Sequence, residues 1–254
     1  MKRRKAGIGI FVIVLIITAV RVKSMDSHRI SGRILAENIA GPGMLRLVEQ
    51  SMQARARKTS VTEIAVKERK HPQAALTFDD GPDIRYTPLL LDGLKERNVR
   101  VSFFLLGEKV EQYPELVERM QKEGHLVGNH TYHHVQLNKL NETKAREEIL
   151  KTNNLIYETT GVYPLSLRPP FGAWKKNLEL CVEMLPVFWT IDTLDWKVQN
   201  TEKIVRTVQE KIEDGAIILM HDEYDTSVEA ALQVVDELKN QGYELVTVDQ
   251  LTLP

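Results

Sequence analysis

The chain has 254 residues, of which 43% are hydrophobic and 27% are charged, so its composition fits a folded core and excludes the disordered class. Residues 1–70 hold 15 Lys and Arg against 5 Asp and Glu, a net charge of +10, whereas the remaining residues hold 19 against 30, a net charge of −11. The acidic main part argues against nucleic acid as a partner, and the single cysteine, Cys181, excludes an internal disulfide and a cysteine-rich zinc cluster.

An uncharged apolar run from Ala6 to Val20 follows the basic stretch MKRRK and precedes Arg21 and Lys23. As a helix, its 15 residues would span roughly 22 Å, short of a ~30 Å hydrocarbon core, and the basic side chains can bridge the difference. The same length fits a secretory signal peptide, but no small-x-small cleavage site follows the run. We therefore expect residues 1–24 to form a cytoplasmic tip and a single transmembrane anchor, with the rest of the chain outside. Secretion after signal cleavage is the alternative.

Residues 25–70 are expected to form a short, basic helical stalk. Gly41-Pro42-Gly43 divides this segment, and five apolar residues on one helical face follow: Met44, Leu45, Leu47, Val48 and Met52. The basic charge indicates a solvated face, and attraction to anionic lipid or wall polymer is the alternative.

From His71 onward, short β-rich runs alternate with charged stretches of helical period. The expected strands cover residues 74–78, 101–106, 125–129, 165–167, 186–191, 216–221 and 243–248. The expected helices cover residues 87–97, 109–123, 141–160, 174–184, 201–214 and 227–240. This alternation without hairpin signals predicts an α/β domain over residues 71–254 with parallel strands, either in a barrel or in an open doubly wound sheet.

Polar residues stand at the ends of five expected strands: Asp79-Asp80, His130 to His134, Arg168, Asp192 to Trp196, and His221. On its own, TFDDG followed by proline fits an ordinary turn. Two adjacent carboxylates after an apolar run also favour a positive partner such as a metal ion, because like charges repel. The C-terminal ends of parallel strands meet at one edge, where active sites gather. The five strand ends together therefore predict a site.

The sequence HTYHH, residues 130–134, supplies histidines for such a site. His130 and His134 are four residues apart, so a helical turn would let them face the same ion. His133 is the competing ligand if the turn is tighter, and a surface loop without a ligand is the reading for an isolated motif. Two histidines with a carboxylate form an open zinc-type site that leaves a position for water.

Five motifs in this order resemble the polysaccharide deacetylases that share the NodB-homology domain, carbohydrate esterase family 4. They are TFDDG (77–81), HTYHH (130–134), RPPFG (168–172), DTLDW (192–196) and LMH (219–221). The resemblance covers residues 71–254 and implies a distorted (β/α) barrel with about seven parallel strands.

The resemblance also implies a metal site and a proton path. Asp80, His130 and His134 would bind a divalent metal, zinc first and cobalt as the alternative. Asp79 would act as general base on a water molecule.

Further residues would orient the acid and the base. Arg168 would hold Asp79 ionised, with a structural salt bridge as its alternative role. His221 would be the general acid and Asp195 its hydrogen-bond partner, whereas a plain core histidine is the alternative for His221.

The same resemblance places the substrate. Trp196 and Leu219 would form an apolar pocket for the acetyl methyl group, and backbone N–H groups near Phe171 would stabilise the oxyanion. Many relatives carry tyrosine at position 171, and we assign no catalytic part to Asp192.

The expected function is metal-dependent removal of N-acetyl groups from a cell-wall or cell-surface glycan. The candidate substrates are N-acetylglucosamine or N-acetylmuramic acid of peptidoglycan and chitin-like oligomers, and the sequence does not choose between them. The alternatives are an O-acetyl polysaccharide esterase and a non-catalytic glycan-binding protein. A glycosidase that uses Asp79 and Asp80 is disfavoured, because paired glycosidase carboxylates flank the bond at ~5–9.5 Å.

Overall fold

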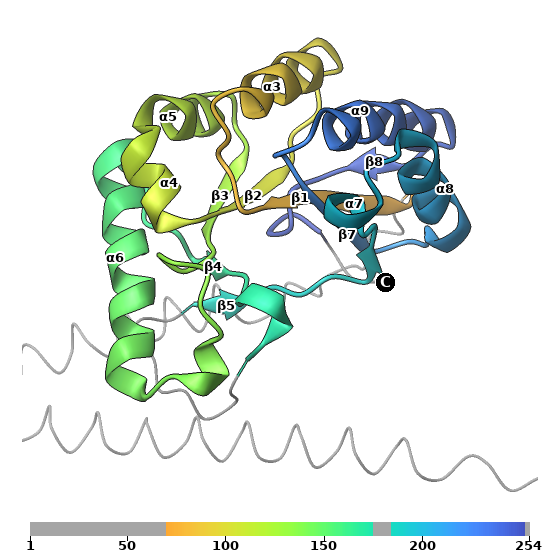
Figure 1. The fold of residues 1–254 in the computed structure, drawn as a ribbon. Helices are drawn as coiled ribbons and strands as arrows, with labels where there is room; N and C mark the ends of the chain where they lie inside the picture. Colours follow the sequence, from red (N-terminus) through yellow and green to blue (C-terminus); the bar gives the residue numbers. More distant parts are fainter. Residues whose placement is uncertain (1–69, 175–183, 252–254) are drawn as a thin grey trace, which may run out of the picture. The chain divides into compact units, whose positions relative to one another are not determined.

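The computed structural model describes residues 70–174 and 184–251 (Figure 1). The predicted anchor, nearly all of the predicted stalk and residues 175–183 of a predicted helix lie outside the described residues. Within the described ranges, no helix combines the length and the apolar character that a membrane span requires. The anchor, the stalk and the boundaries at residues 24 and 70 therefore stay predictions.

One parallel sheet of eight strands forms the centre of the fold. Seven strands follow each other in the order β5-β4-β3-β2-β1-β7-β6, and β8 pairs with the beginning of β1. Within the described chain, β5 and β6 do not pair, so the sheet is an open half-barrel. The predicted α/β class with about seven parallel strands is confirmed. The strands are β1 (Gln73–Asp79), β2 (Ser102–Leu105), β3 (Leu126–Asn129), β4 (Ser166–Leu167), β5 (Leu185–Pro186), β6 (Ile191–Asp192), β7 (Ala216–His221) and β8 (Glu244–Leu245).

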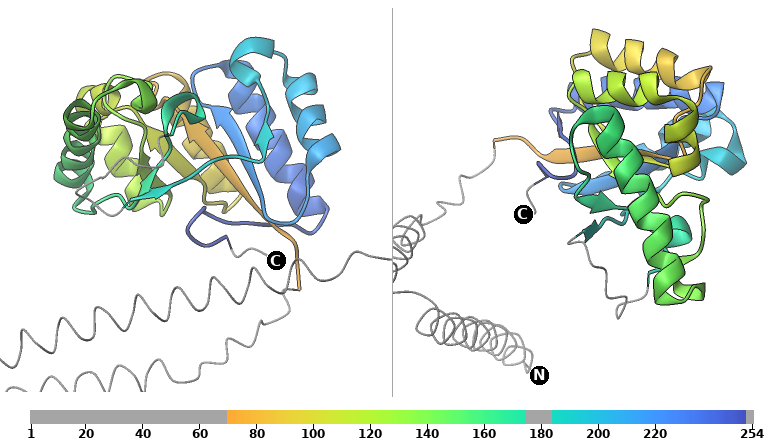
Figure 2. Two further views of the ribbon diagram at one scale, coloured as in Figure 1. Left: turned by 90° about the horizontal axis from the view of Figure 1, so that it is seen from below. Right: turned by 90° about the vertical axis from the view of Figure 1, so that its left-hand side faces the viewer.

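Helices cover the outside of this sheet, and α3, α5 and α9 lie side by side along one face (Figures 1 and 2). The α-helices are α3 (Tyr86–Glu96), α4 (Gly107–Gln112), α5 (Pro114–Lys122), α6 (Glu142–Thr160), α7 (Asp195–Val198), α8 (Thr201–Lys211) and α9 (Asp225–Asn240). Two 3₁₀ turns, η1 (Leu137–Lys139) and η2 (Pro170–Gly172), complete the elements. The long helix α6 begins where the Asn141 side chain accepts from the Lys144 N–H, and it ends at Gly161, whose φ of 73° suits glycine.

The core lies between the sheet and these helices. All seven residues of β1 are buried, because β7 flanks one edge of the strand while β2 and β8 share the other. Phe78 of β1 stacks on Phe103 of β2 with ring centroids 5.4 Å apart. This packing fixes the register of the strands whose ends carry the polar residues.

Three predicted elements were wrong in extent. The expected strand 186–191 is two short strands that pair with different neighbours, and the expected helix 109–123 is two helices, because Pro114 starts a new one. The expected strand 243–248 is reduced to β8. The short helix α7 was not predicted.

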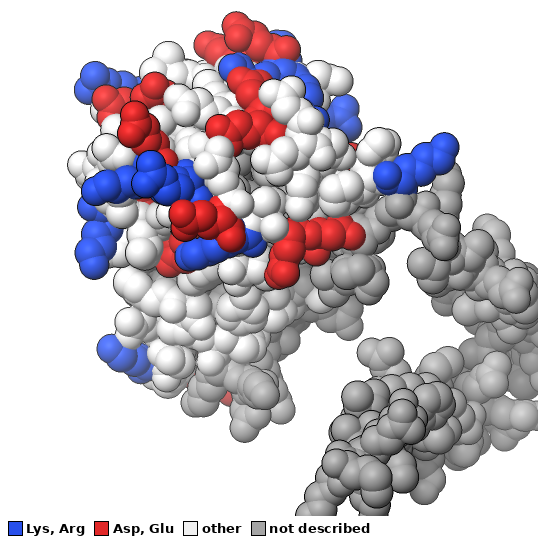
Figure 3. All heavy atoms as spheres, turned by 90° about the vertical axis from the view of Figure 1, so that its right-hand side faces the viewer, with Lys and Arg blue, Asp and Glu red and all other residues white. Residues whose placement is uncertain are grey.

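Surface charge is mixed on the face drawn in Figure 3. Acidic and basic side chains alternate over short distances among the described residues of this face, without an extended basic area.

Candidate active site

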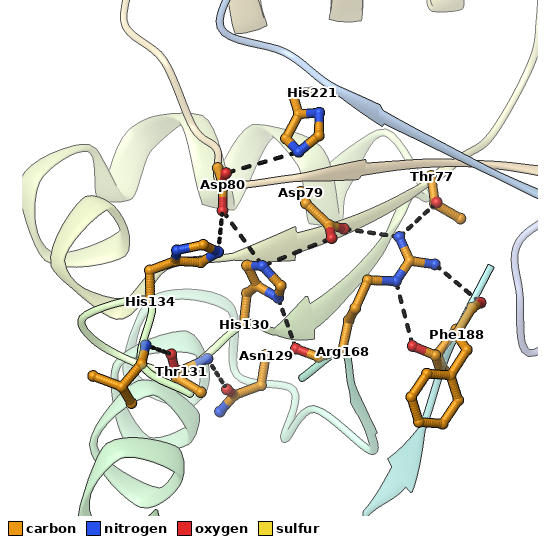
Figure 4. Close-up of polar contacts among 12 residues, drawn as sticks. Thr77, Asp79, Asp80, Asn129, His130, Thr131, His134, Arg168, Phe188 and His221 are labelled. Carbon is orange, nitrogen blue, oxygen red and sulfur yellow. Dashed lines mark hydrogen bonds and ion pairs between the residues drawn. The ribbon is translucent and has the colours of Figure 1, made fainter. Parts of the chain in front are cut away.

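Strand pairing brings the polar residues of the predicted strand ends together. Asp79 and His221 are partners at the ends of β1 and β7, so they stand side by side although 142 residues separate them. Asn129 and Leu167 pair in β3 and β4, which places His130 and Arg168 next to each other one residue further on. Figure 4 shows that these side chains converge.

Asp80, His130 and His134 form the candidate metal site. Nε2 of His130 and Nε2 of His134 each lie 3.4 Å from Oδ1 of Asp80 (Figure 4). The potential ligand atoms of the three residues lie within 4.8 Å of one another. Two ligands at about 2.0–2.1 Å from one tetrahedral ion lie ~3.3 Å apart, so the observed spacing fits a divalent cation.

The donor chemistry of this group also fits a cation. Oδ1 of Asp80 is buried and has no hydrogen-bond partner among the described residues, which is costly for a carboxylate oxygen. Nδ1 of His130 lies 2.6 Å from the backbone carbonyl oxygen of Arg168, which can only accept, so Nδ1 carries the proton. Burial lowers the pKa of His130 to about 3. The imidazole is therefore neutral, and its Nε2 lone pair faces Asp80.

His133, the predicted competitor, lies elsewhere. Its Nδ1 is 2.8 Å from Oε1 of Glu148 on α6, and its side chain is 59% exposed. The tight turn of residues 130–134 thus directs His134, and not His133, towards Asp80.

Arg168 is fully buried and connects Asp79 with the open seam of the half-barrel. Its guanidinium donates to Oδ1 of Asp79 at 2.8 Å and to Oγ1 of Thr77 at 2.7 Å. The same group donates to the backbone carbonyls of Val187 and Phe188, at 3.3 and 3.4 Å. These two bonds run to the segment between β5 and β6, where the expected strand is interrupted. The guanidinium of Arg168 therefore binds backbone carbonyls between β5 and β6, two strands that do not pair within the described chain. It also places a positive charge beside Asp79.

His221 and Asp195 form a second charged pair. Nδ1 of His221 lies 2.8 Å from Oδ1 of Asp195, and the backbone N–H of His221 donates to Oδ2 at 2.7 Å. Burial alone would lower the pKa of His221, but the hydrogen bond and charge of Asp195, aided by Asp79 and Asp80, raise it to about 9. Burial raises the pKa of Asp195, but the bonds and charge of His221 outweigh this and lower it. His221 is thus a protonated imidazolium, with Nε2 3.8 Å from Asp80.

Comparisons with known proteins agree with this geometry. A family profile described as polysaccharide deacetylase matches residues 66–187. A peptidoglycan-N-acetylglucosamine deacetylase of Bacillus cereus is 40% identical over 186 residues, which are 70% of this chain and 68% of the relative. The chain belongs to the polysaccharide deacetylase family.

Two other members extend the comparison. The peptidoglycan-N-acetylglucosamine deacetylase PgdA of Listeria monocytogenes is 42% identical over 185 residues, which are 73% of this chain. The chain spans only 40% of the length of that relative. The structure of the peptidoglycan deacetylase PdaC from Bacillus subtilis matches with a TM-score of 0.69 and 41% identity, covering 72% of this chain and 90% of that one.

Backbone strain surrounds the site in this deacetylase domain. Seven of the described residues other than glycine have φ values between 42° and 69°, in the left-handed region. Such conformations cost free energy, and they persist where the surrounding structure holds them, typically at functional sites. Five of the seven are site residues or direct neighbours of one in the sequence, namely Asp80, Thr131, His134, Phe171 and Leu194, whereas Asn98 and Gln199 are not.

The base of the Asp80 loop rests on a buried carboxyl group. A Cβ atom on Gly81 would lie 2.5 Å from Oδ1 of Asp222, so only glycine fits there. The other oxygen of Asp222 accepts a short hydrogen bond from Oγ1 of Thr87, which itself accepts from the N–H of Asp83. Burial raises the pKa of Asp222 to about 7. Asp222 therefore packs beneath the turn that follows both predicted site carboxylates.

A cavity of about 430 Å³ opens over this constellation. Among the predicted substrate residues, Leu219 is buried in its wall, and Phe171 and Trp196 are exposed at its rim. The Phe171 ring lies 4.6 Å from that of His134. All predicted site residues except Arg168 and Asp195 line the cavity, and those two contact lining residues from behind.

Three further lining residues were missed: Trp189, Glu223 and Tyr224. Glu223 and Tyr224 follow His221 closely, so their place after the end of β7 was a usable signal. Trp189 stood inside the expected strand 186–191, away from the polar strand ends on which the site prediction was based.

Proposed function

We propose that the chain hydrolyses N-acetyl groups of a cell-wall glycan, with peptidoglycan as the substrate class and acetate as a product. The observation that carries the proposal is the buried, unpartnered Oδ1 of Asp80, faced by the Nε2 atoms of His130 and His134. A base candidate and an acid candidate, Asp79 and His221, stand beside this group. The names of the relatives support peptidoglycan as the polymer.

Zn²⁺ is the proposed cation, held by Asp80, His130 and His134, because one carboxylate and two imidazoles suit zinc. Co²⁺ offers the same geometry as an alternative. When bound, the cation supplies Lewis acidity for the acetamido carbonyl and lowers the pKa of water.

Asp79 is the proposed general base. Its Oδ1 is occupied by Arg168, whereas Oδ2 lies 3.7 Å from Nε2 of His130 and faces the candidate metal site. Oδ2 is therefore the atom that would accept the proton from the attacking water. Burial raises the pKa of Asp79, which suits a proton acceptor, and the charges of Arg168 and His221 oppose part of that rise.

His221 is the proposed general acid. Its Nδ1–H is engaged by Asp195, so the proton on Nε2 is the one directed towards the cavity. That proton would pass to the nitrogen of the departing amine. Asp195 fixes the ring orientation and stabilises the imidazolium before the transfer.

The cavity suits an acetylated sugar. Leu219 and Trp196 offer apolar surface for the methyl group, and the exposed rings of Trp196 and Phe171 offer flat surfaces for a pyranose. Among the backbone N–H groups near Phe171, those of Gly172 and Ala173 already donate within the turn. The N–H of Phe171 itself, at a strained φ of 59°, is therefore the proposed oxyanion donor.

We also propose that the catalytic domain stands outside the cell on an N-terminal anchor. The support is the apolar run from Ala6 to Val20, its basic flank and the missing cleavage site. Membrane fractionation tests it: the full-length chain is expected in the membrane fraction. A soluble external form whose N-terminus lies between about residues 19 and 30 would show signal cleavage instead.

Acetate release by the full chain on a panel of glycans tests the activity. The panel consists of N-acetylated peptidoglycan, chitin oligomers and O-acetylated xylan, each with Zn²⁺, with Co²⁺ and with a chelator. We expect acetate from the N-acetylated substrates only when metal is present. Release from xylan alone would assign an O-acetyl esterase, and glycan binding without acetate from any substrate would assign a non-catalytic protein.

A further inference from the structure

Glu148 of α6 holds the loop that carries the second histidine of the candidate metal site. Its Oε2 accepts the backbone N–H groups of Tyr132 and His133, at 3.0 and 2.9 Å. Its Oε1 accepts from Nδ1 of His133 at 2.8 Å. The Glu148 side chain is only 15% exposed, although that of His133 is 59% exposed, so the carboxylate that accepts these three charge-assisted bonds is itself largely shielded from water.

The loop needs such a restraint because its backbone is strained on both sides of these amides. Thr131 has a φ of 67° and His134 a φ of 55°, and neither residue is glycine. Glu148 binds the two amides between them. Without these bonds, relaxation of either strained residue would turn the His134 imidazole away from Oδ1 of Asp80.

Glu148 also engages the competing histidine. His133 stands next to His134, and a change in the turn would present its imidazole to the site instead. The bond from Nδ1 of His133 to Oε1 of Glu148 holds that ring outside the cavity. One carboxylate thus fixes the backbone and occupies the rival side chain.

Other contacts anchor the loop mainly at its start. The Asn129 side chain donates to the carbonyl oxygen of Ile149 and to Oδ1 of Asn153 on α6, and its own Oδ1 accepts from the N–H of Thr131. These bonds fix the backbone up to Thr131. The next two amides are those that Glu148 accepts. Further along, the N–H of Glu108 donates to the carbonyl oxygen of Tyr132 and the N–H of Val135 donates to Oγ1 of Thr131, both at 3.3 Å.

We propose that Glu148 is a positioning residue that selects His134 over His133 as the ligand. The inference rests on the metal site of the proposed function. Residues that hold a metal ligand in place without touching the ion typically contribute 10- to 100-fold to metal affinity, as their substitution shows.

The experiment compares Glu148→Ala with the matched control Glu147→Ala in the full chain. Glu147 precedes it on α6 and is exposed. Zn²⁺ affinity is measured by competition with a chromophoric chelator, and hydrogen exchange of the Tyr132 and His133 amides is measured in the metal-free protein. We expect Glu148→Ala to bind Zn²⁺ about 10- to 100-fold more weakly and to lose protection of both amides. Glu147→Ala should match the wild type in both readouts.

Two further variants separate the parts of the role. His133→Ala removes only the imidazole and keeps the backbone amides that Glu148 binds. Its Zn²⁺ affinity should stay within about threefold of the wild type, a smaller change than the 10-fold minimum expected for Glu148→Ala. Glu148→Gln keeps an acceptor for the amides, so its affinity should lie between those of the wild type and Glu148→Ala. If Glu148→Ala fails to fold, the comparison of Glu148→Gln with its control Glu147→Gln becomes the test of the inference.

Distinct results would overturn the inference and the proposed function. Equal Zn²⁺ affinity of the Glu148 variants and their Glu147 controls would overturn the role of Glu148 alone. A His133→Ala loss as large as that of Glu148→Ala would also overturn it, because the imidazole would then be the group that matters. Failure of the wild type to bind Zn²⁺ would overturn the proposed function. Hydrogen exchange of the Tyr132 and His133 amides would still show whether Glu148 holds the loop.

Discussion

Replacing Asp195 by Asn removes the charge that keeps His221 protonated. The ordinary pKa of histidine is about 6.5, and the surroundings of His221 raise it to about 9. The difference of about 2.5 pH units corresponds to about 3.4 kcal/mol between the two protonation states. Asp195 supplies the largest stabilising contributions, since Asp79 and Asp80 follow it in effect. The Asn variant should therefore have a His221 pKa near or below 6.5.

The consequence for catalysis follows from the protonated fraction. At pH 8, a group with a pKa of 9 is about nine-tenths protonated, whereas a group with a pKa of 6.5 is protonated to only about 3%. In the metal-free protein, the protonated fraction of His221 at pH 8 should therefore fall roughly 30-fold in Asp195→Asn. If His221 is the acid, acetate release by the metal-loaded variant at pH 8 should fall as well, because the same anionic partner is lost. The alkaline limb of the pH–rate profile should move to lower pH, while activity near pH 6 should be affected less.

The assay combines the pH–rate profile with an NMR titration of the His221 ring. The titration uses metal-free protein, because a cation beside Asp80 would lower the pKa of His221. The raised pKa also stabilises the fold: this contribution is complete below about pH 6.5 and is lost as the pH rises through about 9. Urea unfolding should show that loss in the wild type and not in the variant. A wild-type His221 pKa near 6.5, or an alkaline limb that the substitution does not move, would refute the reasoning.

Three further substitutions test neighbouring parts of the site. Arg168→Met leaves Asp79 buried without its cation, so urea unfolding should show a loss of about 3–5 kcal/mol, and an unchanged stability would contradict the burial argument. Asp79→Asn should lower acetate release at least ~10²-fold while the folded protein keeps its zinc, and near-normal turnover would place the base elsewhere. Gly81→Ala would bring its Cβ to 2.5 Å from the Asp222 carboxylate and should cost about 1–3 kcal/mol in unfolding free energy. Adding Asp222→Ala should reduce that cost, and strictly additive losses would exclude the clash.

The sequence allowed the site residues that stand at the ends of strands to be predicted. Asp79, His130, Arg168 and His221 each stand at or directly after the end of an apolar run, and parallel pairing carries such ends to one edge. The α/β class followed from the alternation of the same runs.

The remaining features depend on contacts that no local pattern carries. The choice between His133 and His134 depends on Glu148, which lies on α6 and binds the loop through backbone amides. In the interrupted part of the expected strand 186–191, the backbone carbonyls of Val187 and Phe188 accept from the Arg168 guanidinium. Both are long-range interactions of a side chain with backbone groups, and the spacing of apolar residues in the sequence does not predict such interactions.

Acetate release from N-acetylated peptidoglycan, before and after chelation, tests the central claim most directly. The account predicts that the wild type and His133→Ala lose activity with a chelator and recover it with Zn²⁺. It predicts that His134→Ala recovers little, because the variant lacks one of the three candidate metal ligands, Asp80, His130 and His134. Activity that survives chelation, or a His134→Ala enzyme that recovers fully while His133→Ala does not, would contradict the account.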